Sequence, residues 1–371
     1  MAGYIMTIDS LESLDKCIKS GTYSTVLGKP RNGNWGVHHE GTFADYLSME
    51  EGNHIYFFFK RKIYGIGELV NIGDDCKYLN YFKADIPKNY SDDDYSKLSP
   101  LLEEGNTANR CLCLFKPSPY FFKKGIDMDD VLASNPQKFK MLRAMWKVSF
   151  IKIDDEEDSA LMDIILKRNE EELYEQKDIY EFSNSHHLKI EHKIKQDHRL
   201  NTYNILLNAK DENKIKHEMA IEAHLCEMLK TDNEVFGKWD YISHQVIASP
   251  FKPIDYMDKM DIFGYRYIKG YNTISKYLII EIKKDAASVE VIDQVMKYVD
   301  WVTQEYAFGD YSMVEAYIVA SDFPEEVIEK NKKDSIRYFT KGNRPTESCE
   351  WSDCTLVSYN YENDEIEFNK E

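Results

Sequence analysis

Residues that could do chemistry stand in two segments of the second half of the chain, Asp261 in one and Glu281 with Lys283 in the other. Glu281 and Lys283 end an apolar run over 278–282 that reads as a strand, and strand side chains alternate between two faces. Both charges therefore point the same way, which costs free energy on an apolar strand unless something uses them. A turn over 269–272 would let a strand beginning at Asp261 pair with this one, so that the two carboxylates converge.

Two carboxylates beside an ammonium suit metal-assisted hydrolysis. Carboxylate oxygens are hard ligands that Mg²⁺ prefers, and Mn²⁺ is expected to substitute. Such a metal acidifies a water and stabilises charge on an attacked phosphate, while Lys283 orients that water or stabilises the transition-state charge. Two alternatives stay open: Asp255, in a loop-like region, replaces Asp261, or Glu281 and Lys283 are only a solvated pair on an edge strand.

The elements around these residues predict an α/β core with a mixed sheet flanked by helices. Residues 214–230 have the apolar stripe of an amphipathic helix, and strand-like runs follow at 261–267 and 277–283. A helix is expected over about 288–306 and a strand over 315–320. The order helix, strand, strand, helix, strand is typical of this fold class.

Four short motifs occur in order over about residues 214–322. They are the helical ExxL of Ile221-Glu222-Ala223-His224-Leu225, the strand Asp261, the ExK of Glu281-Ile282-Lys283, and a helix with Gln294 and Tyr298. Together they resemble the PD-(D/E)xK nuclease superfamily, and most closely its NucS-like, RecB-type branch. The chain departs from the literal motif at Met260, which stands where that family often has proline.

This resemblance implies a metal-dependent endonuclease acting on DNA. It implies that Asp261 and Glu281 bind the metal and that Lys283 is the catalytic lysine. It also implies that Glu222 assists the metal site from its helix and that Gln294 lies at the rim. Glu218, one helical turn before Glu222, is an alternative for the helix carboxylate or a solvated side chain.

The first third of the chain predicts a mostly-β domain. Residues 53–60 and 62–70 read as a hairpin, and further strands are expected at 111–115 and 148–153. A loop over 88–110 and a short helix over 136–145 complete this part. Trp35-Gly36, Asn53 and the 62–70 strand resemble the EVE/PUA-like β-barrel group over about residues 20–153.

That second resemblance implies recognition of a base. Several such domains hold a flipped, modified base between aromatic walls, and stacking offsets the cost of unstacking it. The candidate walls are Trp35, Tyr56, Phe58 and Trp146. The alternative is that these aromatic side chains fill the core of the barrel.

Length and composition indicate how many domains the chain contains and where positive charge is gathered. A chain of 371 residues exceeds one ordinary core. We expect an EVE/PUA-like barrel over 1–155, a charged helical connector over 156–213 and a nuclease domain over 214–371. The net charge of −18 requires positive charge to be gathered locally, for which 186–199 and 330–344 are candidates, unless both are simply solvated surface.

The whole sequence predicts a Mg²⁺-dependent DNA endonuclease in restriction or anti-phage defence, with an N-terminal domain that reads modified bases. One alternative is a NucS-like repair nuclease for mismatched or branched DNA. Another is a non-enzymatic nucleic-acid or nucleotide-binding protein. Because cutting both strands needs two active sites, we expect a homodimer or higher homo-oligomer. Seven scattered cysteines and the lack of a long apolar run or signal peptide predict a cytoplasmic protein without a membrane partner.

Overall fold

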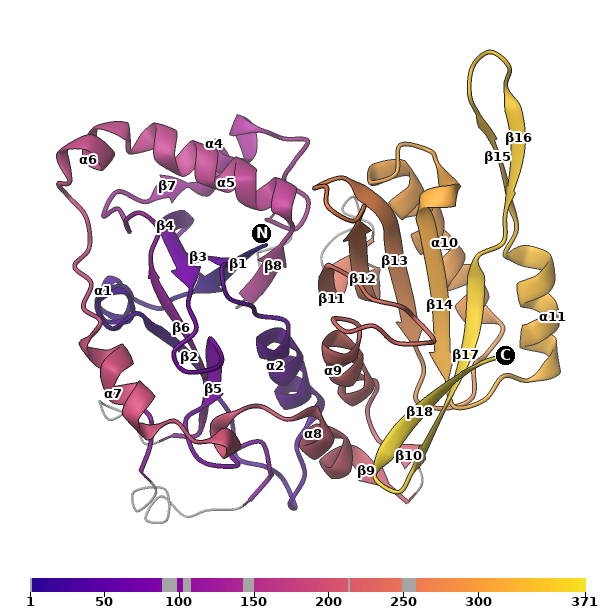
Figure 1. Cartoon of the computed structure of the whole chain (residues 1–371), viewed down its shortest axis with the longest axis horizontal. Helices are drawn as coiled ribbons and strands as arrows, with labels where there is room; N and C mark the ends of the chain where they lie inside the picture. Colours follow the sequence, from indigo (N-terminus) through magenta and orange to yellow (C-terminus); the bar gives the residue numbers. More distant parts are fainter. Residues whose placement is uncertain (1, 89–98, 103–107, 143–149, 213, 249–257) are drawn as a thin grey trace. The chain divides into compact units, whose positions relative to one another are not determined.

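The computed structural model describes residues 2–88, 99–102, 108–142, 150–212, 214–248 and 258–371. The chain forms two compact units (Figure 1). The first unit contains Met1–Gly33 and Met49–Asn201, and the second contains Asn34–Ser48 and Thr202–Glu371. The connector expected over 156–213 is therefore divided at Asn201, with most of it in the first unit, and a short N-terminal segment belongs to the second unit.

The first unit is built on a curled mixed sheet. Its strands have the order β2-β6-β4-β3-β1-β8, with β5 paired to β6 and β7 to β4. Only β1 and β3 run parallel among these described pairs. The bounds are β1 Gly3–Thr7, β2 Thr22–Val26, β3 His54–Phe59, β4 Lys62–Leu69, β5 Lys77–Leu79, β6 Arg110–Pro117, β7 Ile126–Asp127 and β8 Phe150–Ile153. The described residues contain no pairing of β2 with β8, so the expected closed barrel is not confirmed.

The predicted hairpin of the first unit is present as β3 and β4. Phe59 pairs with Lys62 at the turn, and the register shifts between Ile55 and Phe57. Gly67 lies where a β-carbon would meet the Phe121 ring at 2.5 Å, so this strand needs glycine for a close approach. The aromatic run of β3 thus fills the interior of the unit.

Helices cover the first sheet, and some of them lie within 156–213, where the sequence predicted a separate connector. They are α1 Leu11–Ser20, α4 Met128–Ser134, α5 Asp155–Arg168, α6 Glu170–Glu175 and α7 Ser185–Lys193. Asp154 caps the N-terminus of α5, because its side chain accepts the N–H groups of Glu156 and Glu157. The helix packs Leu161 and Ile165 into the same core as Tyr56. Because that apolar face is buried, 156–201 folds as part of the first unit. The helix expected over 136–145 is absent from residues 136–142.

The second unit has the mixed sheet that the sequence predicts, in the order β11-β12-β13-β14-β17-β18. Strands β13, β14 and β17 run parallel and the other neighbours antiparallel. The strands of this sheet are β11 Tyr241–Ile247, β12 Lys259–Tyr267, β13 Ile274–Ile282, β14 Val314–Ala320, β17 Cys354–Glu362 and β18 Glu365–Lys370. Two further pairs of strands lie outside it: β9 Lys210–Asp211 pairs with β10 Lys214–Ile215, and β15 Arg337–Lys341 pairs with β16 Glu347–Trp351. Its helices are α2 Val37–Leu47, α8 Thr202–Ala209, α9 Glu218–Met228, α10 Glu290–Glu305 and α11 Glu325–Asp334.

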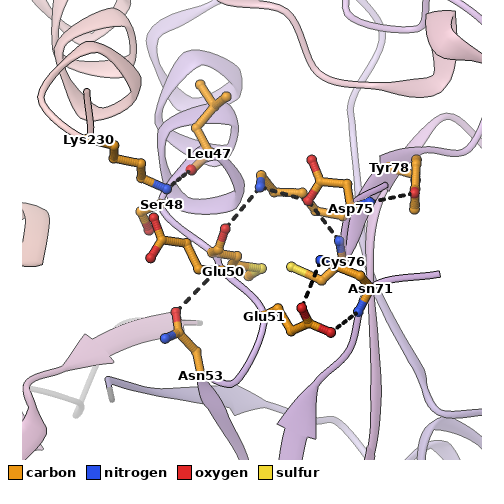
Figure 2. Close-up of polar contacts among 12 residues, drawn as sticks. Leu47, Ser48, Glu50, Glu51, Asn53, Asn71, Asp75, Cys76, Tyr78 and Lys230 are labelled. Carbon is orange, nitrogen blue, oxygen red and sulfur yellow. Dashed lines mark hydrogen bonds and ion pairs between the residues drawn. The ribbon is translucent and has the colours of Figure 1, made fainter. Parts of the chain in front are cut away.

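Helix α2 is the N-terminal segment that joins the second unit. It packs on α9, with Phe43 fully buried. Glu40 Oε1 lies 3.0 Å from His217 Nδ1 at the start of α9, and Lys230 Nζ donates to the Leu47 carbonyl at 2.8 Å (Figure 2). No local pattern in the sequence predicts this long-range pairing.

The chain returns to the first unit directly after α2. Glu51 accepts hydrogen bonds from the backbone and the side-chain amide of Asn71, at 3.3 and 3.0 Å (Figure 2). Lys77 Nζ donates to the Met49 carbonyl at 2.9 Å. The segment after Ser48 is therefore fixed on its own unit by polar contacts.

A buried carboxyl in α5 makes the first unit sensitive to pH. Glu157 is fully buried, and its Oε1 accepts the N–H groups of Lys140 and Leu142 at 2.6 and 3.1 Å. Burial, and then the charge of Asp154, raise the pKa of Glu157 from 4.5 to about 8. The folded protein therefore keeps a proton that the unfolded chain releases between these two pH values.

We expect the stability of the first unit to fall as pH rises from about 4.5 to about 8, since unfolding then releases this proton. Glu157→Gln keeps the acceptor and removes the titration, so thermal unfolding from pH 5 to 8 should show a flatter profile. The difference should reach about 1 to 3 kcal/mol at pH 8. Glu156→Gln, exposed one residue earlier, is the control, and equal slopes in the two variants would contradict the prediction.

Candidate active site

Strands β12 and β13 bring Asp261 and Glu281 together. Ile262 pairs with Ile280 in antiparallel register, so Asp261, one residue earlier, lies beside Glu281, one residue later. Asp261 Oδ2 accepts the backbone N–H of Ile282 at 2.8 Å, which fixes its side chain against β13. The fold therefore produces the convergence that the spacing predicts.

Lys283 directly follows β13 and completes the group. Its N–H donates to the Val319 carbonyl on β14 at 2.8 Å, and its Nζ donates to Glu281 Oε1 at 2.6 Å. Strand β13 lies between β12 and β14, and Glu281 is only 1% exposed. The alternative of a solvated pair on an edge strand is therefore wrong, although the Lys283 side chain, 31% exposed, still reaches solvent.

Glu222 from α9 adds a third carboxylate. The ExxL helix buries Ile221 and Leu225, and Glu222 itself is 2% exposed. Gln245 on β11 links it to the strands, because its Nε2 donates to both Glu222 oxygens, at 3.0 and 3.2 Å, and to Asp261 Oδ1 at 3.2 Å. The site thus draws on α9, β11, β12 and β13.

The site carries more negative than positive charge. Burial, and then the charges of Glu281 and Glu222, raise the pKa of Asp261 well above its usual value. Burial likewise raises the pKa of Glu281 to about 7, against the opposing effect of Lys283. Burial works against the ammonium of Lys283, yet the surrounding carboxylates raise its pKa. Such mutual perturbation is typical of functional sites.

His244 forms ion pairs with two carboxylates, one of which is Glu222. His244, beside Gln245 on β11, lies 2.7 Å from Asp45 of α2 through Nε2 and 3.5 Å from Glu222 Oε2 through Nδ1. Burial opposes the imidazolium, but Asp45 and Glu222 raise the pKa of His244 to about 10. The sequence analysis missed Asp45, His244 and Gln245. The one available signal was the polar pair His244-Gln245 inside the apolar run of 241–247.

Gln294 and Tyr298 of helix α10 bond to each other. Gln294 Nε2 donates to the Tyr298 hydroxyl at 2.8 Å. Burial raises the pKa of Tyr298, and the charges of Glu281 and Asp261 raise it further. Tyr298 therefore lies close enough to these carboxylates to interact with them electrostatically. Glu218 Oε1 accepts the N–H of Lys284 at 3.2 Å, which ties α9 to the end of β13. Asp255 lies outside the described residues.

Of the four aromatic residues expected to form a base-binding cage, the three in the described ranges pack against other protein side chains instead. Trp35 belongs to the second unit, is 4% exposed, and packs on His39 and Phe43 with ring centroids 4.8 and 5.8 Å away. Its expected place at the rim of the first domain is wrong, because its segment folds with α2. Tyr56 is fully buried with its hydroxyl donating to Asp158 Oδ1 at 2.8 Å, and Phe58 packs against the core. Trp146 lies outside the described residues.

The basic stretch over 330–344 is partly neutralised. Lys330 lies 2.6 Å from Asp293, Arg337 pairs with Asp300 at 2.8 Å, and Lys341 lies 3.1 Å from Asp310. These pairs reduce the charge available to a phosphate backbone. They favour the interpretation of this stretch as ordinary surface.

The donor set fits one hard divalent cation. Within the described ranges, no three histidine, cysteine, aspartate or glutamate side chains are grouped closely enough to hold a metal ion. Mg²⁺, however, is commonly held by one or two carboxylates and keeps several waters. Glu281 Oε2 is buried without a hydrogen-bond partner, which leaves one anionic oxygen beside Asp261 for a cation. The residues therefore fit Mg²⁺ through two carboxylates.

Comparison with known proteins adds little to this geometry. No family model matches the sequence, and no curated protein matches it. A weak structural neighbour is a repair endonuclease from Pyrococcus abyssi, with 22% identity and a TM-score of 0.22 over 34% of this chain and 46% of that one. A hypothetical protein from Leishmania major has 14% identity and a TM-score of 0.28 over 47% of this chain and 97% of that one.

With such low TM-scores, neither likeness carries an argument about fold or function. This chain also spans less than half of the endonuclease. Among helices in the described part of the chain, none has the length and apolar character needed to cross a bilayer.

The converging carboxylates lead to a stability prediction. In EDTA, Glu281→Gln should raise the melting temperature by a few degrees, or about 1 to 2 kcal/mol, because it removes one buried charge and keeps an acceptor for Lys283. The matched control is Glu315→Gln on β14, which weakens the ion pair with Arg266 at 2.6 Å and should lower the melting temperature. Parallel losses of stability in both variants would show that Glu281 is an ordinary structural carboxylate.

Proposed function

We propose that the second unit is a metal-dependent nuclease that hydrolyses phosphodiester bonds in DNA. The observation that supports this most is the convergence of Asp261 and Glu281 beside Lys283 on interior strands. Burying like charges in this way destabilises a fold, and the cost is understandable where chemistry uses the charges. The order of motifs along the sequence supports the same activity.

The two strand carboxylates have the chemistry to hold the metal. Asp261 and Glu281 would bind Mg²⁺ or Mn²⁺, with Glu222 assisting from α9. When bound, such a cation lowers the pKa of a water and stabilises charge on a phosphoryl oxygen. The Glu281 oxygen without a hydrogen-bond partner supports this assignment.

Lys283 and the backbone of Ile282 have separate roles in charge stabilisation and positioning. The Lys283 ammonium is held by Glu281 and partly exposed, so it can orient an attacking water or stabilise charge on the phosphate. Asp261 is held by the Ile282 N–H, which limits its movement as charge builds up. Tyr56 lies in the core of the first unit and Phe58 packs against it, so we assign no base recognition to them.

The nuclease activity can be tested with matched variants. The full-length protein should cut DNA with Mg²⁺ or Mn²⁺ and lose activity with EDTA. Asp261→Ala, Glu281→Ala and Lys283→Ala should each lower the rate by about 10²-fold or more. The control is Asp293→Asn, an exposed ion-pair carboxylate on α10, which should cut like the original protein.

Two results would contradict the proposal. Full activity in any of the three alanine variants would refute the site. Nucleic-acid binding without cleavage under every metal condition would favour a non-enzymatic binding protein. Plain, mismatched, branched and base-modified DNAs tested side by side would separate a repair from a defence substrate.

Assembly is a second consequence of the proposed reaction. Cutting both strands of a duplex at one place needs two active sites, and closed two-fold dimers are the commonest way to provide them. We therefore expect a homodimer by sedimentation velocity at the concentration used for cleavage. A monomer that still makes double-strand breaks in one binding event would contradict this expectation.

A further inference from the structure

The backbone of Gln245 is strained next to the candidate active site. Its φ is +53°, in the left-handed region that side-chain-bearing residues rarely adopt, although it lies within β11. His244 pairs with Ile262 and Val246 with Met260 in one unbroken register. A single residue therefore departs from an otherwise regular strand, and such strain persists where surrounding contacts hold it.

The contacts that hold Gln245 are the carboxylates of the site. Its Nε2 lies 3.0 and 3.2 Å from the two Glu222 oxygens and 3.2 Å from Asp261 Oδ1. One side-chain amide thus joins a carboxylate of α9 to a carboxylate of β12. These carboxylates repel each other, and the amide donors between them reduce that repulsion.

The choice of an amide has a physical reason. Lysine or arginine at this position would place a full positive charge on the site and compete with a cation for the same oxygens. A glutamine donates hydrogen bonds and leaves the negative charge of Glu222 and Asp261 in place. It can therefore set the distance between the carboxylates while reducing their attraction for a metal less than a full positive charge would.

The residue before Gln245 contacts the same carboxylate. His244 Nδ1 lies 3.5 Å from Glu222 Oε2, and its Nε2 is held by Asp45 at 2.7 Å. Consecutive residues of β11 therefore contact Glu222, and helix α2 supports one of them. This arrangement gives β11 a positioning role beyond its place in the sheet.

We propose that Gln245 is a positioning residue that holds Glu222 and Asp261 at the spacing needed to bind a divalent cation. This inference rests on the proposed nuclease function and names a residue that sets its metal affinity. Outer contacts of this kind change metal affinity by about 10- to 100-fold when removed.

The test is Mn²⁺ binding to the full chain by isothermal titration calorimetry, without DNA. Gln245→Met keeps the size and removes the donors, so we expect binding at least about 10-fold weaker than in the original protein. Gln304→Met, exposed on α10, is the control and should bind Mn²⁺ normally. Unchanged or tighter binding in Gln245→Met would overturn the proposal.

A second pair of variants separates positioning from simple structural support. Gln245→Gly and Gln245→Ala both lack the amide and should both bind Mn²⁺ weakly. The glycine variant should melt at the higher temperature, because glycine adopts the left-handed conformation freely, whereas in an ordinary strand alanine is the more stable. Normal Mn²⁺ affinity in the glycine variant would refute the positioning role even if Gln245→Met failed to fold.

The original protein and Glu281→Gln distinguish this inference from the proposed function. If the original protein binds Mn²⁺ and Glu281→Gln does not, the metal site stands and the Gln245 variants alone decide the inference. If the original protein does not bind Mn²⁺, the proposed function fails and the positioning role fails with it.

Discussion

The second unit is organised around three neighbouring carboxylates that repel one another, two of them buried. Glu222, Asp261 and Glu281 come from three different elements, and the cations Lys283 and His244 lie beside Glu281 and Glu222. Charges of one sign move apart unless rigid structure prevents it. The interior position of β13 and the packing of α9 supply that rigidity, so the sheet serves as a frame that keeps the charges together.

The contacts around the site each reduce this repulsion differently. Lys283 offsets charge on Glu281, the Ile282 N–H stabilises Asp261, and His244 with Asp45 supports Glu222. None of them fully offsets burial and repulsion, because the pKa values of Asp261 and Glu281 are still raised. Holding carboxylates together in this way costs stability, which is the kind of cost that functional sites carry.

Local sequence patterns predicted the parts of the site that lie close together in the chain. The apolar run before Glu281 and the alternation of strand faces were enough to place Glu281, Lys283 and their partner Asp261. Gln245 is close to Asp261 in sequence, but its left-handed backbone within β11 breaks the ordinary strand pattern and was not predicted. The contribution of Asp45 depends on pairing with a segment far along the chain, which no local period encodes. The same reason explains the error at Trp35, since its burial depends on a helix that folds with residues far along the chain.

The membership of α2 in the second unit has a consequence for the order of folding. Synthesis runs from the N-terminus, so Asn34–Ser48 is made long before Thr202. Helix α2 is therefore complete well before its partner α9 has been made. Closing so long a loop is slow, and contacts of this kind delay folding. Because Asp45 on α2 contacts His244, the surroundings of the carboxylate cluster combine one segment made early with strands and a helix made much later.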